Sequence, residues 1–262
     1  MEKQPGMVSF VGAGPGDPEL LTLKGKRLIE EAALLLYAGS MIPPALLDLA
    51  SPRASVIDAA PLDLEECHSL MLQFARAGQP VVHLHTGDPA VYSALREQLA
   101  LLDRDGIPWQ VVPGITAAST AAAALGAPLQ NGFSLVSLSD LLVPADEVRR
   151  NLRAVAQSAL PVTLYNPAGR KRRQLLAEAL DIFREARGGD ILCAFVRHAG
   201  RPEETRWIGR LADLPADDVD MSTLVLIGSA RTVTDQGALF EARGYAEKYL
   251  DKDAPASAAD GR

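Results

Sequence analysis

The chain has 262 residues, of which 48% are hydrophobic and 23% are charged, a balance typical of globular proteins. This length excludes a short peptide and fits two modest domains. The net charge of −7 argues against a general nucleic-acid binder, which needs clustered cations. No apolar run reaches the length of about 18 residues that a membrane span requires. The first residues lack the pattern of a secretion signal, so we expect a cytoplasmic protein without a membrane partner.

The first half of the chain alternates short apolar runs with amphipathic segments. We expect strands at residues 8–11, 34–37, 81–85 and 109–112, and helices at residues 20–33, 64–77, 93–104 and 117–125. Such alternation predicts a mostly parallel sheet.

The second half repeats this organisation after a predicted hinge at residues 126–132, which contains Pro128, Asn131 and two glycines. Strands are expected at residues 134–138, 162–165, 191–196, 205–210 and 223–228, and helices at 147–159 and 173–187. We therefore expect an α/β protein with mostly parallel or mixed sheets in two domains, residues 1–125 and 126–250. A flexible tail is expected at residues 251–262.

Three loops rich in Gly and Pro follow expected strands and should meet at one edge of the first sheet. They are residues 12–18 (GAGPGDP), 86–89 (TGDP) and 113–117 (PGITA). Each loop alone is explained by a tight turn, and Asp88 by a helix N-cap. Three such loops at the carboxyl ends of parallel strands indicate a ligand site.

A dinucleotide site fits the first loop poorly. Asp17 stands where the last glycine of a GxGxxG motif belongs, and Pro15 lacks the N–H that would face a pyrophosphate. The second strand ends at Tyr37 and is followed by Ala38, where a ribose-binding acid would be needed. These departures argue against the hypothesis of a nucleotide-dependent oxidoreductase. Failure of the protein to bind NAD(P) would exclude that hypothesis.

The remaining polar residues indicate no metal or nucleophile site. Cys67 and Cys193 are the only cysteines, and their spacing predicts neither a disulfide framework nor a zinc site. His83 and His85 share a strand face without an evident third ligand, so packing or one hydrogen bond is favoured over a metal. The basic run at residues 169–173 opens a helix, and it is either a solvated face or a site for ligand carboxylates.

Taken together, the loops resemble those of the tetrapyrrole methylases, which transfer a methyl group from S-adenosyl-L-methionine (SAM) to precorrins, uroporphyrinogen and related substrates. The matching segments are residues 11–22, 86–89 with Tyr92, and 112–117, in the order and spacing of that family. The resemblance runs from about residue 8 to about residue 245. It implies two α/β domains with SAM in the cleft between them and the tetrapyrrole in an adjoining trough.

The resemblance also implies roles for individual residues. Those carried over as cofactor-binding are Pro15, Thr86, Gly87, Asp88, Val91, Thr116, Ala117, Asn166 and Ala199. Candidates for the substrate trough, chosen by loop position, are Tyr37, Ser40, Arg53, Arg149, Arg150, Arg170 and Arg201. In the uroporphyrinogen branch an acidic residue stands at the position of Ala38, so that branch is disfavoured and no general base is assigned.

The two halves of the chain resemble different members of the family. Residues 24–27, 36–40, 83–89 and 96–98 look like precorrin-4 C11-methyltransferases, whereas residues 137–142, 164–167, 196–201 and 219–223 look like precorrin-3B C17-methyltransferases. We expect C11-methylation of a precorrin or cobalt-precorrin in cobalamin biosynthesis, with C17-methylation and ring contraction as the alternative. A non-catalytic corrinoid-binding protein stays open, and the family suggests a homodimer.

Overall fold

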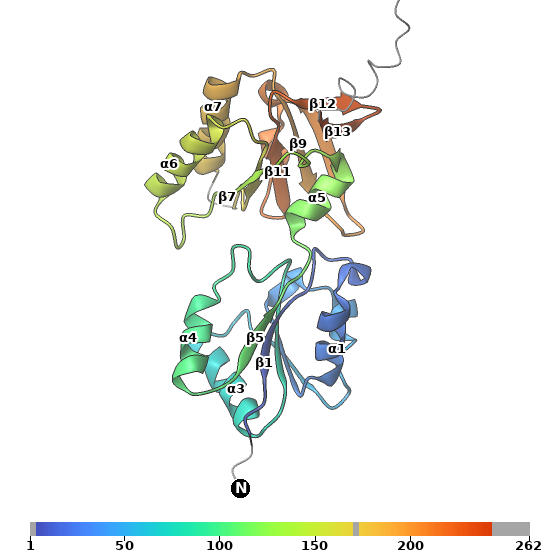
Figure 1. Cartoon of the computed structure of the whole chain (residues 1–262), viewed down its shortest axis with the longest axis vertical. Coiled ribbons are helices and arrows are strands. Elements are labelled where there is room, and N and C mark those ends of the chain that lie inside the picture. The colour runs from blue at the N-terminus through green and yellow to red at the C-terminus, as the bar shows by residue number, and fades with distance from the viewer. Residues whose placement is uncertain (1–3, 170–172, 243–262) are drawn as a thin grey trace, which may run out of the picture. The chain divides into compact units, whose positions relative to one another are not determined.

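The computed structural model describes residues 4–169 and 173–242 (Figure 1). It divides into two compact units. The N-terminal unit comprises Met1–Ala121 together with His198–Glu204, and the C-terminal unit comprises Ala122–Arg197 and Thr205–Arg262. The tail expected at residues 251–262 lies outside the described residues.

The N-terminal unit is built on a five-stranded, fully parallel sheet with the order β3-β2-β4-β1-β5. Its strands are β1 (Val8–Gly12), β2 (Leu34–Tyr37), β3 (Ser55–Asp58), β4 (Val81–His85) and β5 (Trp109–Val112). The inner strands are almost wholly buried, as expected for a sheet covered on both faces.

Helices cover both faces of this sheet. Helices α1 (Leu23–Glu31) and α2 (Pro44–Leu47) pack on one apolar cluster, and α3 (Leu64–Arg76) and α4 (Arg96–Arg104) pack on the other. The chain therefore leaves β1 toward one face and leaves the neighbouring β4 toward the opposite face. Such a switch point is where open α/β sheets bind their ligands.

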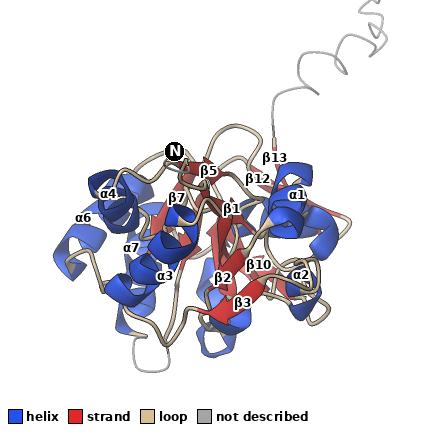
Figure 2. Ribbon diagram, turned by 90° about the horizontal axis from the view of Figure 1, so that it is seen from below, coloured by secondary structure: helices blue, strands red, loops and turns tan. Residues whose placement is uncertain are grey.

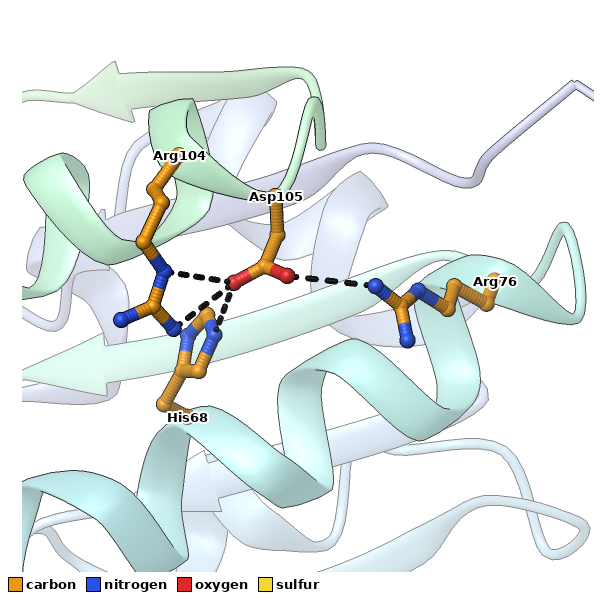
Figure 3. Close-up of polar contacts among 4 residues, drawn as sticks. All are labelled: His68, Arg76, Arg104 and Asp105. Carbon is orange, nitrogen blue, oxygen red and sulfur yellow. Dashed lines mark hydrogen bonds and ion pairs between the residues drawn. The ribbon is translucent and has the colours of Figure 1, made fainter.

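A polar cluster joins His68 and Arg76 of α3 to the C-terminal end of α4 (Figure 3). The Asp105 carboxylate accepts hydrogen bonds from His68 Nε2 at 2.9 Å, Arg76 at 3.1 Å and Arg104 at 3.0 Å. The hydrogen bonds from His68 and Arg104 lower the pKa of Asp105. Because Asp105 directly follows α4 and the chain then leads into β5, this cluster lies at the edge of the sheet opposite the Gly-rich loops.

The C-terminal unit contains a mixed five-stranded sheet with the order β10-β9-β11-β8-β7. The neighbours β7 (Ser134–Ser137) and β8 (Val162–Tyr165) form a parallel pair. The other neighbouring pairs, which involve β9 (Leu192–Arg197), β10 (Thr205–Arg210) and β11 (Thr223–Ile227), are antiparallel. Helices α6 (Ala145–Ala156) and α7 (Gln174–Arg187) supply apolar side chains to the core of this unit, and Figure 2 shows helices and strands in separate colours. The expectation of an α/β fold with parallel and mixed sheets is confirmed.

A small sheet, β12-β13-β6, completes the C-terminal unit. Its strands are β12 (Thr232–Asp235), β13 (Ala238–Glu241) and β6 (Gly126–Ala127), which lies within the segment expected to be a hinge. Helix α5 (Ala117–Leu125) precedes β6, and the border between the two compact units falls inside that helix.

Some expected elements differ from the structure. The helix expected at residues 20–33 begins only at Leu23, because Thr22 caps it and a 3₁₀ turn, η1 (Pro18–Leu20), comes first. The helix expected from residue 93 begins at Arg96. Further 3₁₀ turns are η2 (Gly39–Met41), η3 (Leu211–Asp213) and η4 (Ala216–Asp218). Across the described ranges, no helix combines the length and apolar character needed to cross a membrane.

Candidate active site

The three Gly-rich loops of the N-terminal unit are in direct backbone contact. Gly14 and Gly87 exchange two hydrogen bonds, with N···O distances of 3.1 and 2.7 Å. A Cβ atom on Gly12 would lie 2.5 Å from the backbone nitrogen of Gly114, and one on Gly114 would overlap the carbonyl oxygen of Gly87. These positions need glycine because any side chain would force the loops apart.

Gly87 is buried, and a Cβ atom placed on it would meet no close neighbour. Its φ of +67° belongs to the left-handed region, and the nearest atom to a Cβ placed there is the backbone nitrogen of Ala117 at 3.9 Å. Ala117 begins α5, whose first N–H groups carry a partial positive charge. The position beside Gly87 at this helix start is therefore suited to a ligand whose anionic end meets the helix N-terminus.

Asp88 and its neighbours shape one side of this position. The Asp88 carboxylate accepts a hydrogen bond of 2.8 Å from the N–H of Ala90, which closes the turn after Gly87. Thr86 is exposed and Val91 is half-buried in the same loop. Six residues expected to bind the cofactor, Pro15, Thr86, Gly87, Asp88, Thr116 and Ala117, thus lie in the three converging loops.

The loop between β9 and β10 also contributes to the N-terminal unit. Ala199 is buried there, and a Cβ atom on Gly200 would lie 2.9 Å from Cγ of Pro15. Arg201 donates from Nε to the carbonyl oxygen of Pro15 at 3.3 Å and from Nη2 to that of Met41 at 2.7 Å. The structure thus brings the loop of Ala199 to Pro15, a cofactor residue from the start of the chain.

Asn166 belongs to the C-terminal unit, directly after β8. It adopts a φ of +50°, and its side-chain amide donates to Ser137 Oγ at 2.9 Å. It lines a cavity of about 270 Å³ together with Ser139, Leu141, Arg149, Gln174 and Met221. The cavity mixes hydrogen-bonding groups with apolar walls, which is typical of small-molecule sites.

Arg149 is already paired within the C-terminal unit. Its guanidinium donates to Glu178 at 2.7 Å and to Asp146 at 2.7 Å, and these hydrogen bonds raise its pKa. The same pairing with Arg149 lowers the pKa of Glu178. An arginine held by two carboxylates is a poor candidate for a substrate carboxylate, because binding would require an existing ion pair to break.

The other substrate candidates are scattered. Tyr37 is half-buried at the end of β2, and Ser40 follows in η2 at the same edge of the sheet. Arg53 precedes β3 and is therefore at the opposite edge, which corrects the expectation that it lies beside the trough. Arg150 is exposed on α6. Arg170 lies outside the described residues.

Asp58 was missed by the sequence reasoning. It ends β3 beside Tyr37, and its carboxylate accepts hydrogen bonds from the N–H groups of Gly39 at 3.0 Å and Ala60 at 2.9 Å. It thereby fixes the loop that follows β2. The signal was weak because β3 is mostly exposed and has only two consecutive apolar residues, Val56 and Ile57.

His83 and His85 are neutral packing residues beneath the loops. Burial lowers the pKa of His83 to about 4 and that of His85 to about 3. Nδ1 of His83 lies 2.9 Å from Oε1 of Gln98, and since that oxygen only accepts, the imidazole donates. Among the described residues, no group of three or more His, Cys, Asp and Glu is placed to hold a metal ion.

Comparisons with known proteins agree with this geometry. Residues 7–215 match the family model of tetrapyrrole (corrin/porphyrin) methylases. A precorrin-4 C(11)-methyltransferase of Rhodococcus erythropolis is 36% identical, with 93% of this chain and 95% of the relative covered. The cobalamin biosynthesis protein CbiHC of Archaeoglobus fulgidus is 34% identical over 93% of this chain, which spans only 54% of that relative.

Solved structures give the same result. The methyltransferase CobJ superimposes with a TM-score of 0.81 at 28% identity, covering 90% of this chain and 100% of the other. A uroporphyrin-III C-methyltransferase of Thermus thermophilus in complex with S-adenosyl homocysteine superimposes with a TM-score of 0.67 at 33% identity, covering 85% and 92%. The resemblance inferred from the loop motifs is confirmed.

Proposed function

Since this chain belongs to the tetrapyrrole (corrin/porphyrin) methylase family, we propose that it is a SAM-dependent C-methyltransferase acting on a precorrin or cobalt-precorrin in cobalamin biosynthesis. The observation that carries the proposal is the convergence of three glycine loops at the switch point of the parallel sheet. The names of the relatives, which include C11- and C17-methyltransferases, support the substrate class.

The residues present fit the cofactor. Gly87 has a φ of +67°, which favours glycine, and no side chain stands between it and the N-terminus of α5. In the proposal, Thr86, Gly87 and Asp88 hold the methionine end, while Thr116, Ala117, Pro15 and Ala199 line the same site. Asn166 in the C-terminal unit is carried over from the family pattern and stays a prediction.

Chemically, the protein's main task is alignment. SAM brings an activated methyl group, and an electron-rich ring carbon of a precorrin is already a nucleophile. Holding two reactants in line supplies about 7–11 kcal/mol of barrier lowering. The rigid contacts among Gly12, Gly14, Gly87 and Gly114 provide a frame in which the cofactor has one position. No general base is assigned.

We propose C11 of precorrin-4 as the methylated position. The loop after β2, with Tyr37 and Ser40, resembles that of C11 enzymes, and this loop lies at the ligand edge of the sheet. Full-length relatives named precorrin-4 C(11)-methyltransferase are 36% and 33% identical. The alternative is C17-methylation, which is favoured by relatives named cobalt-factor III C(17)-methyltransferase at 30% and 33% identity.

A cytoplasmic homodimer is proposed from the family resemblance alone. Sedimentation equilibrium of the purified protein tests the dimer, and fractionation of the source cells tests the compartment. A monomer at micromolar concentration would contradict the first expectation.

Turnover assays test the function directly. The purified protein is given SAM with precorrin-4 or, separately, with precorrin-3B, and also with the cobalt form of each, and S-adenosyl homocysteine formation is followed. We expect the kcat/KM to be higher with precorrin-4 or its cobalt form than with precorrin-3B or its cobalt form. Preferred turnover of precorrin-3B would favour C17, whereas tight binding without turnover of any substrate would favour a corrinoid-binding protein.

A further inference from the structure

Arg201 connects two loops that come from strands not adjacent in the sheet. Pro15 belongs to the loop after β1, and Met41 belongs to the turn after β2, while β4 lies between these two strands. One guanidinium binds the backbone carbonyl oxygens of both, through Nε at 3.3 Å and Nη2 at 2.7 Å. Arg201 therefore spans the end of β4, where the loop with Thr86 and Gly87 begins.

The chain provides a fitted seat for this side chain. Gly16 has a φ of +143°, and a Cβ atom there would lie 2.7 Å from Cγ and 2.9 Å from Nε of Arg201. Gly200 has a φ of +72°, and a Cβ atom there would press on Pro15. The absence of a side chain at both glycines lets Arg201 lie flat against the Gly-rich loop.

The loop that carries Arg201 is held in shape by its own hydrogen bonds. The N–H of Gly200 donates to Glu204 Oε2 at 2.8 Å, the N–H of Arg201 donates to the oxygen of His198 at 3.0 Å, and the N–H of Glu204 donates to the oxygen of Arg201 at 3.0 Å. Because the backbone of this loop is already ordered, binding of the two acceptors costs only the rotamer entropy of the Arg201 side chain.

We infer that Arg201 is a positioning residue that fixes the cofactor loop at Pro15 relative to the substrate loop at Met41. This role differs from the expectation that Arg201 binds a substrate carboxylate, because two of its donors are already used on backbone carbonyls. It rests on the proposed function, in which one loop touches SAM and the other touches the tetrapyrrole. A small shift between these loops would lengthen the methyl-transfer distance.

The first test compares Arg201→Met and Arg201→Lys with wild type. Methionine keeps an apolar side chain in the seat but removes both donors, whereas lysine offers one nitrogen that can reach one carbonyl at a time. We expect kcat to fall about 10–100-fold in Arg201→Met and less in Arg201→Lys, since sub-ångström misplacement is costly in aligned reactions. The SAM Kd and the tetrapyrrole KM should each stay within roughly 3-fold of wild type.

The matched control is Arg210→Met. Arg210 lies in β10 beyond the loop that carries Arg201, and it also donates to a backbone carbonyl, that of Asp190 at 2.6 Å. Arg210 and Asp190 both belong to the C-terminal unit, and this hydrogen bond involves neither Pro15 nor Met41, so the kcat of Arg210→Met should equal that of wild type.

A second readout does not depend on turnover. Amide hydrogen exchange at residues 39–43 and 14–17 should be faster in Arg201→Met than in wild type and unchanged in Arg210→Met. An unchanged kcat, or a raised tetrapyrrole KM with normal kcat, would overturn the inference, the latter in favour of a substrate-binding arginine. If Arg201→Met lowers the Tm and also weakens SAM and tetrapyrrole binding together, the residue has a general structural role, and the inference is also overturned. If wild type itself shows no turnover, the proposed function fails, and unchanged exchange would then separately refute the positioning role.

Discussion

Replacing Gly87 with alanine separates ligand binding from backbone strain. A valine there would add a branched side chain at a φ of +67° and endanger folding, whereas alanine adds a single methyl. That methyl meets no protein atom nearer than 3.9 Å, so the cost to the free protein is the left-handed backbone alone, about 1–2 kcal/mol. For a chain of this size, each kcal/mol lowers Tm by about 2–4 °C.

Gly106 is a matched control for that strain. Its φ is +66°, and a Cβ atom on it has nothing within 4 Å, but it lies at the opposite edge of the sheet, after α4. Gly106→Ala and Gly87→Ala should therefore lose similar stability. Only Gly87→Ala should lose SAM affinity, by about 10–100-fold, because its methyl overlaps the ligand at a cost of about 1–3 kcal/mol.

Isothermal titration calorimetry with SAM, and thermal unfolding without it, measure the two effects. A folded Gly87→Ala protein that binds SAM as wild type does would refute the assignment of the cofactor site beside Gly87 at the start of α5. Equal weakening of SAM binding in Gly106→Ala would show that general destabilisation, not contact, is the cause.

Four further expectations concern charge. The folded pKa of His83, about 4, is below its unfolded value of about 6.5. The free energy of unfolding is therefore unaffected by this group above pH 6.5 and decreases as the pH falls from 6.5 toward 4. In urea unfolding, the free energy of unfolding should fall between pH 7.5 and pH 5 in both proteins, and the fall should be about 2 kcal/mol smaller in His83→Gln than in wild type. Arg187 donates to four backbone carbonyl oxygens around the end of α6 and β11. Arg187→Met should therefore lower the free energy of unfolding by roughly 3–5 kcal/mol, and a loss below 1 kcal/mol would contradict these bonds. Arg173 donates to the carbonyl oxygens of residues 216 and 217, so Arg173→Gln should lower Tm and leave tetrapyrrole affinity unchanged. Neutralising residues 170–172 should weaken tetrapyrrole binding and its salt dependence, and unchanged affinity would indicate a solvated face.

Buried strands were the part of the fold most readily predicted. The strands at residues 34–37, 81–85 and 162–165 agree with expectation end to end, because each is a short apolar run next to Gly, Pro or polar residues. The exposed β3 and the hairpin of β12 and β13 were not expected, because β3 and β12 are mostly exposed and β13 has only three consecutive apolar residues. The position of β3 follows from pairing with β2 and that of β13 from pairing with β6, which are tertiary contacts.

The candidate site divides in the same way. The glycine loops were identified because each combines a strand end with residues that permit close backbone approach. The partners of Arg149 and Arg201 were not predicted, because a guanidinium's partner is set by the folded chain. Arg201 binds the oxygen of Met41, which is 160 positions away, and Arg149 binds Glu178 on the neighbouring helix. No local pattern distinguishes such paired arginines from free ones.

Transfer of a labelled methyl group tests the central claim most directly. The protein is incubated with SAM carrying a ¹³C-labelled methyl and with either precorrin-4 or precorrin-3B, in separate reactions. The product of each reaction is examined by carbon NMR. We predict one new labelled methyl on C11, formed together with an equal amount of S-adenosyl homocysteine. Absence of label from the tetrapyrrole, with SAM bound but unconsumed, would contradict a methyltransferase, and label on C17 of a ring-contracted product from precorrin-3B would contradict the proposed position.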